Sequence, residues 1–157
     1  MEIERKFLIK KLPADLDRYP VHSIEQAYLN TDPVIRIRRE DDLYYLTWKG
    51  KGLMVREEYN LPLNRPSYEH LLKKADGAAI TKRRYRIPCP PYTVELDVFA
   101  PPFSPLVMAE VEFPDEESAN AFLPPGWFGP EVTRDPAYHN SALSRTGRCP
   151  ESFSLRG

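Results

Sequence analysis

Charged residues recur at every second position in several short segments of the sequence, and most of these segments carry one sign of charge. The acidic examples are Glu2-x-Glu4, Glu95-x-Asp97 and Glu110-x-Glu112, and the basic ones are Arg36-x-Arg38 and Lys82-x-Arg84. Carboxylate oxygens are the ligands that Mg²⁺ and Mn²⁺ prefer, and Arg and Lys bind phosphate oxygens. The pattern therefore predicts a surface that holds metal cations and a phosphate-bearing anion together.

A sheet face that is simply solvated is the competing interpretation, and alternation alone would favour it. Like charges on one face of a strand repel one another, however, so a solvated face has no reason to sort its charges by sign. Phosphoryl transfer depends mainly on positioning, charge neutralisation and an in-line nucleophile, which such a surface can supply. The sequence contains no Gly-x-x-x-x-Gly-Lys-Ser/Thr loop, so we do not expect phosphate to be bound at a helix N-terminus.

The composition argues against several other classes of protein. The net charge of −1 disfavours a nucleic-acid binder. No apolar run approaches the ~20 residues of a membrane span, and the first residues carry no apolar signal region, so we expect a cytoplasmic protein without membrane contact. Cys89 and Cys149 belong to no Cys-x-x-Cys or Cys/His cluster, so we expect neither a zinc site nor a redox site.

Short β-strands are expected to position the charged residues, because alternating segments rich in β-branched and aromatic residues end at Pro, Gly, Asp or Asn. Seventeen prolines also favour short strands over long helices. The predicted strands are Glu2–Ile9, Gln26–Asn30, Val34–Glu40, Leu43–Lys49, Val55–Leu61, Thr81–Ile87, Tyr92–Phe99 and Val107–Phe113. Many consecutive short strands predict a largely antiparallel sheet or barrel.

Three helices are predicted between and after these strands. The first covers about Ser67–Asp76, with Gly77 after its end, and the second runs from about Asp115 to Phe122. The third begins at Asp135, which can cap it, and ends at Gly147. The length fits one domain, so we expect residues 1–146 to form a single domain and residues 147–157 to form a poorly ordered tail.

The order of these motifs resembles that of a known family, the CYTH proteins or triphosphate tunnel metalloenzymes. Glu2-Ile3-Glu4-Arg5-Lys6 is similar to the family's Glu-x-Glu-x-Lys signature. The segments that follow also resemble the family's strands and closing helix, and they are Gln26–Leu29, Arg36–Arg38, Leu46–Gly50, Arg56–Tyr59, Lys82–Tyr85, Glu95–Phe99, Ala109–Phe113 and Asp135–Asn140. The resemblance covers roughly residues 1–146.

The resemblance implies an eight-stranded antiparallel β-barrel that forms a charged tunnel with flanking and closing helices. It also implies a triphosphate-bearing small molecule as substrate, Mg²⁺ or Mn²⁺ as cofactor, and an inorganic triphosphatase that cleaves tripolyphosphate to pyrophosphate and phosphate. Nucleoside or thiamine triphosphates are further candidate substrates, and a homodimer is left open.

Site residues follow from the resemblance, motif by motif. The residues expected to bind metal are Glu2, Glu4, Asp97, Glu110 and Glu112. The residues expected to bind triphosphate are Lys6, Arg36, Arg38, Lys49, Lys82 and Arg84. Glu58, Asn60 and Glu95 are expected to line the tunnel, and Asn60 replaces an acid that many relatives carry, so it can supply only a neutral hydrogen bond there.

Tyr28 beside Lys6 is the candidate catalytic pair, because a nearby ammonium favours the phenolate that could accept a proton from water. A strand tyrosine that is merely packed is the alternative for Tyr28. His139 is expected to have a surface or capping role, and Asn140 a structural one. Two other functions are left open. The first is a class IV-type adenylate cyclase, although no adenine pocket can be identified, and the second is a sensor of polyphosphate or nucleotides without catalysis.

Overall fold

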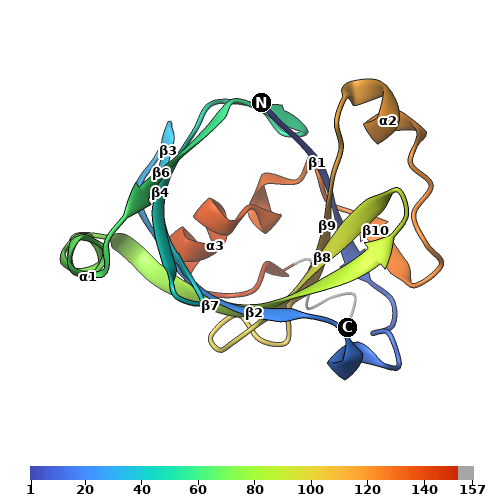
Figure 1. Cartoon of the computed structure of the whole chain (residues 1–157), viewed down its shortest axis with the longest axis horizontal. Coiled ribbons are helices and arrows are strands. Elements are labelled where there is room, and N and C mark those ends of the chain that lie inside the picture. The colour runs from blue at the N-terminus through green and yellow to red at the C-terminus, as the bar shows by residue number, and fades with distance from the viewer. Residues whose placement is uncertain (152–157) are drawn as a thin grey trace.

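The computed structural model describes residues 1–151 and contains one antiparallel sheet of ten strands. The strands are β1 (Glu2–Ile9), β2 (Val21–Thr31), β3 (Val34–Glu40), β4 (Leu43–Lys49), β5 (Val55–Arg56), β6 (Glu58–Leu63), β7 (Asp76–Cys89), β8 (Tyr92–Phe99), β9 (Val107–Glu112) and β10 (Phe128–Glu131). Their order in the sheet is β10-β1-β9-β8-β7-β2-β3-β4-β6, and β5 pairs with β1. Figure 1 shows that the strands curl into a ring.

The short strand β5 brings the two ends of this order together. Glu2 pairs with Arg56 and Ile3 pairs with Val55, while the other half of β1 pairs with β10. Because β6 follows β5 after the single residue Glu57, β1 and β6 come close and the barrel is nearly closed. This closure places the acidic start of the chain beside the strands that carry Lys49 and Glu58.

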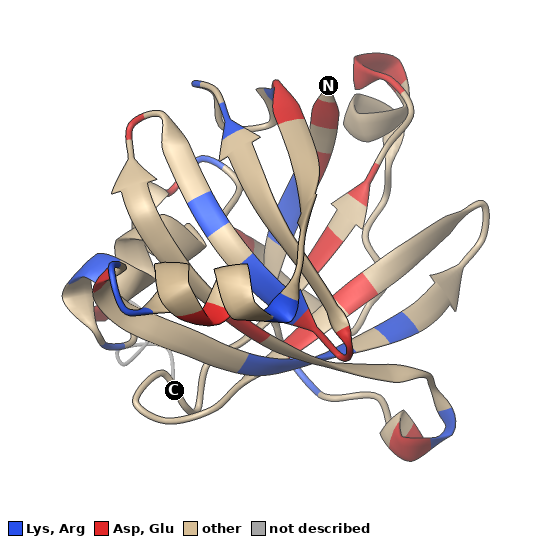
Figure 2. Cartoon of the chain, turned by 60° about the vertical axis from the view of Figure 1, so that its left-hand side comes forward, with Lys and Arg blue, Asp and Glu red and all other residues tan. Residues whose placement is uncertain are grey.

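The barrel buries its apolar side chains on its outer face and at one end, and turns charged side chains inward. One apolar cluster lies under α1 (Arg65–Leu72), where Tyr68 packs on Ala27 and Ile37. A second includes Phe7 and Ala119 of α2 (Glu116–Ala121), and a third includes Leu143 of α3 (Asn140–Thr146). In Figure 2 bands of acidic and basic residues recur along strands on both sides of the barrel.

The helices begin at residues that satisfy their free backbone N–H groups. The Asn64 side chain accepts from Ser67 N at 2.8 Å at the start of α1, and Asp115 accepts from Ser118 N at 2.6 Å at the start of α2. Figure 1 shows α1 and α2 outside the barrel, whereas α3 lies across the interior of the ring in that view. The helix α3 ends at Gly147, whose φ of 71° suits glycine.

Several sequence-based expectations were wrong in detail. The sheet has ten strands rather than eight, because the expected strand 55–61 breaks at Glu57 and β10 was not predicted. The first helix starts at Arg65 and ends at Leu72, since β7 already begins at Asp76. The segment after Asp135 is a short 3₁₀ helix, Pro136–Tyr138, followed by α3. A further 3₁₀ helix, Leu16–Arg18, lies between β1 and β2.

The expected tail at 147–157 lies partly outside the described residues, which end at 151. Within the described part, Cys149 is half-buried and packs against the third apolar cluster. Among residues 1–151, no helix has both the length and the apolar character needed to cross a membrane.

Strand β6 has one free edge, because within the described residues it pairs only with β4. Gly50 N donates to Glu57 O at 3.0 Å. Tyr59 and Leu61 follow Glu57 at intervals of two residues and lie opposite Trp48 and Leu46, so their backbone groups also point toward β4. The backbone groups of the alternate residues, which include Pro62, therefore point away from β4.

Candidate active site

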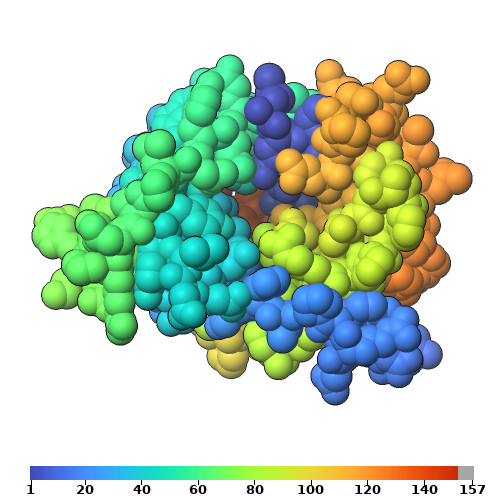
Figure 3. Space-filling model, viewed as in Figure 1, coloured from blue at the N-terminus to red at the C-terminus, as the bar shows by residue number. Residues whose placement is uncertain are grey.

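A cavity of about 410 Å³ occupies the middle of the barrel. Figure 3 shows the surface hollowed at the centre of the ring, with the red-brown colour of the C-terminal part at the bottom of the hollow. Eight basic and seven acidic side chains line the cavity. The lining residues predicted from sequence are Glu2, Glu4, Lys6, Tyr28, Arg36, Arg38, Lys49, Glu58, Asn60, Lys82, Arg84, Glu95, Glu110 and Glu112.

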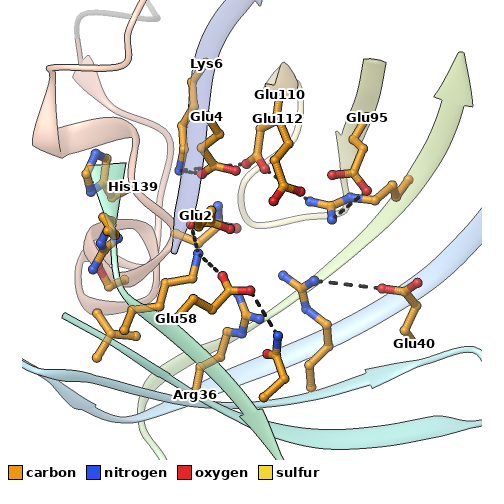
Figure 4. Close-up of a pocket in the computed structure, with 18 of the residues that line it drawn as sticks. Glu2, Glu4, Lys6, Arg36, Glu40, Glu58, Glu95, Glu110, Glu112 and His139 are labelled. Atoms are coloured by element: carbon orange, nitrogen blue, oxygen red, sulfur yellow. Dashed lines mark hydrogen bonds and ion pairs between the residues drawn. The ribbon is translucent and has the colours of Figure 1, made fainter. Parts of the chain in front are cut away.

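Strands β1 and β9 form an acidic wall around one lysine. Their register places Glu4 opposite Glu112 and Lys6 opposite Glu110 (Figure 4). The Lys6 ammonium lies 3.7 Å from Glu4 and 3.8 Å from Glu110, so one cation is shared between two carboxylates. Burial and the charge of Glu110 raise the pKa of Glu4, and burial and the charge of Glu58 raise that of Glu112. Burial would raise the pKa of Glu110 too, but the charges of Lys6 and Arg84 lower it, so Lys6 favours the ionised form of Glu110.

Lys49 connects this wall to β6. Its ammonium lies 2.8 Å from Glu2 and 3.2 Å from Glu58. Burial and the charge of Glu4 raise the pKa of Glu2 to about 8. Burial would raise the pKa of Glu58 as well, but its hydrogen bond with Glu2 and the charge of Lys49 lower it to about 2. The pair thus favours a proton on Glu2 and a carboxylate on Glu58, beside the Lys49 ammonium.

Strand β3 supplies a basic wall with few acids near it. The Arg38 guanidinium is 3.8 Å from Glu40, and Arg36 donates to the neutral hydroxyl of Thr47 at 3.0 Å. Arg36 Nε is buried and has no hydrogen-bond partner among the described residues. Burial and the charge of Arg38 lower the pKa of Arg36. These features fit a place where an anion supplies the missing acceptor.

The bases of β7 are, by contrast, paired with acids. Lys82 Nζ lies 2.7 Å from Asp97, and Arg84 donates to both Asp97 oxygens at 2.7 and 2.9 Å. Asp97 is fully buried and is not among the described residues that line the cavity. Burial alone would raise the pKa of Asp97, but Arg84 and Lys82 lower it. Asp97 therefore holds two bases in place, whereas Glu95, two residues earlier, reaches the cavity.

Tyr28 and Asn60 both reach the cavity. Tyr28 of β2 stands opposite Arg36 of β3, lines the cavity and is also part of the third apolar cluster, so its position is compatible with either of its two expected roles. Asn60 accepts a hydrogen bond from Thr47 at 2.6 Å and donates to Glu58 at 3.0 Å. Asn60 thus links the basic wall to the Glu2–Glu58 pair through neutral hydrogen bonds.

The cavity also contains residues that the sequence reasoning did not assign to the site, namely Val34, Glu40, Tyr45, Arg56, Arg86, His139, Asn140 and Ser141. Glu40, Arg56 and Arg86 continue the period-two pattern of their strands, so that pattern could have identified them. His139, Asn140 and Ser141 stand at the start of α3, and no periodicity in their own segment indicates that they face the cavity. Burial and the charge of Lys6 lower the pKa of His139 to about 4.

Within residues 1–151, no group of three or more His, Cys, Asp or Glu side chains is already arranged to hold a metal ion. Lys6 and Lys49 lie between the acids that would have to converge. The donor set nevertheless suits a hard divalent cation, because it consists of carboxylates, and burial together with neighbouring acids raises the pKa values of Glu2, Glu4 and Glu112.

Comparison with known proteins decides the family. Residues 1–122 match the family model described as the CYTH domain. This chain belongs to the CYTH family. A CYTH-family relative named inorganic triphosphatase, from Nitrosomonas europaea, is 41% identical over 148 residues, covering 91% of this chain and 96% of the relative. Another inorganic triphosphatase, from Acetivibrio thermocellus, is 34% identical over 148 residues, covering 90% and 92%.

The CYTH fold is also found among solved structures. A crystal structure described as that of an inorganic triphosphatase aligns with a TM-score of 0.68 and 38% identity, and covers 92% of this chain and 94% of that chain. The nearly closed antiparallel barrel and its helices therefore agree with the fold expected from the sequence, apart from the number of strands.

Proposed function

We propose that this CYTH protein is a metal-dependent hydrolase that cleaves inorganic triphosphate to pyrophosphate and phosphate. The observation that carries the proposal is a cavity walled by charge, in which Val34 is the only aliphatic side chain among the described lining residues. A substrate that is all phosphate makes full use of such walls, whereas a nucleobase would need an apolar slot. Both curated relatives bear the name inorganic triphosphatase, which supports the same conclusion.

The acidic wall is the proposed place for Mg²⁺ or Mn²⁺. Glu4, Glu110 and Glu112 on β1 and β9, together with Glu2, would hold the ion. When bound there, a divalent cation neutralises phosphate charge and lowers the pKa of coordinated water. Asp97, which the sequence reasoning placed among the metal ligands, is now proposed to hold Lys82 and Arg84 instead, because both its oxygens already accept from them.

The bases are proposed to bind the triphosphate. Arg36 and Arg38 face the cavity with little acidic compensation, and an Arg fork matches two phosphate oxygens. Lys6, Lys49, Lys82 and Arg84 complete the binding set and also pair with the acids. The substrate therefore lies between a basic wall that attracts it and an acidic wall whose metal neutralises its remaining charge.

Hydrolysis then requires one proton transfer. Water attacks a terminal phosphorus, a new P–O bond forms, the P–O bond of the anhydride breaks, and pyrophosphate leaves with the bonding electron pair. Tyr28 is the candidate that accepts the water proton, and Lys6 lies close enough for the two groups to interact electrostatically. Tyr28→Phe should lower kcat while leaving KM unchanged. Unchanged turnover would mean that Tyr28 only packs.

The deciding experiment measures phosphate release from tripolyphosphate and from ATP with Mg²⁺, Mn²⁺ or EDTA. We expect metal-dependent release from tripolyphosphate that falls about a hundredfold or more in Glu4→Gln, because metal-borne stabilisation is worth several kcal/mol. Glu57→Gln is the matched control, since Glu57 is an exposed residue outside the cavity lining. Binding without cleavage would favour a sensor, and a cyclic nucleotide formed from ATP would favour a cyclase.

A further inference from the structure

Gln26 is fully buried inside the barrel wall and yet is not among the described residues that line the cavity. Its Oε1 accepts a hydrogen bond from Arg38 Nε at 2.8 Å, across the β2–β3 pair. Because an arginine can only donate, this contact fixes which end of the Gln26 amide is oxygen. The other end, Nε2, donates to Asn140 Oδ1 at 3.0 Å and lies 3.4 Å from Tyr28 Oη.

Asn140 receives this hydrogen bond at the start of α3. Its Oδ1 also accepts from Lys82 Nζ at 3.0 Å, so two donors converge on one oxygen. The amide of Asn140 is therefore held in one orientation. Asn140 is 8% exposed and lines the cavity, and both hydrogen bonds of its side chain within the described part of the chain fall on Oδ1 rather than Nδ2. A donor that is held in one orientation, belongs to a buried residue and has no acceptor among the described residues beside a polar cavity points to a ligand oxygen.

The chain Arg38–Gln26–Asn140–Lys82 also joins two basic strands through α3. Arg38 belongs to β3 and Lys82 to β7, and in the sheet they are separated by β2, which carries Gln26. Lys82 also pairs with Asp97 at 2.7 Å, and Arg38 lies 3.8 Å from Glu40. Gln26 and Asn140 add one hydrogen bond from a neutral acceptor to each base, which helps to fix its position without adding further negative charge.

We propose that Asn140 is a substrate-binding residue and that Gln26 is the residue that positions it. Asn140 Nδ2 donates to a non-bridging phosphate oxygen of the substrate, next to Lys82. Gln26 keeps the Asn140 nitrogen pointing toward the cavity and holds Arg38 at the same time. This assignment rests on the proposed function for the identity of the ligand as a polyphosphate, and it adds a neutral donor to the cations proposed to bind that ligand.

Asn140→Asp is the first test. It keeps an oxygen for Lys82 and Gln26 but replaces the free donor with a second oxygen that repels phosphate. A hydrogen bond to a charged group is worth about 1.5–3 kcal/mol, so we expect KM for tripolyphosphate to rise about tenfold to a hundredfold. The Kd for tripolyphosphate, measured by calorimetry in EDTA, should rise by a similar factor, with kcat changed much less than KM.

Gln26→Glu tests the positioning role. The new carboxylate still accepts from Arg38, but it cannot donate to Asn140 Oδ1, so the Asn140 amide should turn its nitrogen away from the cavity. We expect the same rise in KM and Kd as for Asn140→Asp, with a melting temperature close to that of wild type because the charge pairs with Arg38. Arg145→Gln, at an exposed position of α3, is the control and should leave KM unchanged.

The outcomes separate this proposal from the proposed function. If wild type hydrolyses tripolyphosphate while Asn140→Asp and Gln26→Glu keep the wild-type KM and Kd, the role of Asn140 is refuted and the hydrolase stands. If wild type binds but does not cleave, and both variants bind more weakly, the hydrolase fails and the role of Asn140 stands. Should Asn140→Asp not fold, Asn140→Ala removes the same donor without adding charge, and an unchanged Kd would refute the proposal.

Discussion

The two basic strands of the cavity carry nearly the same pattern, Arg-x-Arg on β3 and Lys-x-Arg on β7, but their surroundings differ. On β7 Lys82 and Arg84 lie 2.7 Å from Asp97, whereas on β3 the carboxylate of Glu40 lies 3.8 Å from Arg38. Arg36 has only a hydroxyl partner, and its Nε has none among the described residues. The bases of β7 are thus neutralised by a carboxylate in contact with them, whereas those of β3 make hydrogen bonds mainly to neutral groups.

This difference separates two uses of buried cations. A buried charge that is already paired contributes mainly to the integrity of the fold, because removing its partner leaves it uncompensated. A buried charge without a partner destabilises the empty cavity and is stabilised when an anion arrives. Strand β7 should therefore respond to substitution mainly in stability, and strand β3 mainly in substrate binding.

The largest expected effect is on stability and comes from Asp97→Asn. It leaves Lys82 and Arg84 without their shared carboxylate, and breaking a buried ion pair in this way costs about 3–5 kcal/mol. Urea unfolding measures the change. Glu95→Gln is the control, since Glu95 is partly exposed and should cost much less. A loss below about 1 kcal/mol for Asp97→Asn would remove the distinction between the two strands.

Arg36→Gln should show the opposite pattern, with weaker substrate binding and no loss of stability. We expect KM for tripolyphosphate to rise about tenfold to a hundredfold, corresponding to about 1.5–3 kcal/mol, while the free energy of unfolding stays the same or increases. Steady-state kinetics and urea unfolding on the same preparations test both parts. Arg39→Gln changes an arginine three residues further along β3, which is absent from the described lining, and should leave KM as it is. A strong loss of stability in Arg36→Gln would contradict the comparison.

A metal ion bound at the acidic wall should stabilise the protein, by a smaller amount than the loss expected for Asp97→Asn. Mg²⁺ or Mn²⁺ at about ten times its Kd should raise the free energy of unfolding by about 1.4 kcal/mol, and EDTA should abolish the gain. Glu112→Gln should lose most of this stabilisation, whereas Arg36→Gln should retain it. Thermal unfolding with and without the metal measures it. Equal gains in all three proteins would place the metal elsewhere.

The smallest effect concerns His139 at the start of α3. Its pKa is about 4 in the folded protein, against about 6.5 for an unperturbed ring, so the unfolded state takes up the proton first as the pH falls. Its contribution is complete above about pH 6.5 and is lost progressively toward about pH 4. After discounting for solvent screening of the half-buried ring, the loss between pH 7 and pH 5 should be about 1 kcal/mol.

Urea unfolding at pH 7 and pH 5 provides the measurement, with His139→Gln as the comparison. The variant should lose less stability than wild type over this interval by the same amount. An identical pH dependence in both proteins would mean that solvent reaches the ring freely, and that Lys6 and burial do not act on it.

The sequence predicted the inward-facing charges because side chains alternate between the two faces of a strand. This alternation is the same in a flat sheet and in a barrel. The sequence could not separate Glu95 from Asp97, which share a face and a spacing, because the distinction depends on Lys82 and Arg84 of another strand. It likewise gave no sign that Asn140 faces the cavity, since that depends on how α3 packs against β7 and β2.

The errors in the barrel have similar causes. Strand β10 contains Phe128-Gly129-Pro130-Glu131, whose Gly and Pro disfavour a strand locally, and pairing with β1 imposes the extended conformation. The break at Glu57 carries no Gly or Pro. The break arises because the chain changes its partner strand at this point. Before Glu57, β5 pairs with β1, and after Glu57, β6 pairs with β4. Barrel closure is a property of distant strands, and local sequence does not record it.

The free edge of β6 has a consequence for behaviour at high protein concentration. An open edge can template the strands of other molecules and start aggregation, and Tyr59 and Leu61 on this strand are largely exposed. Pro62 lacks an N–H at one of the positions that points away from β4, so an incoming strand meets an interrupted row of donors. Pro62 thus disfavours the addition of further strands to the free edge of β6, the edge at which the barrel is not fully closed.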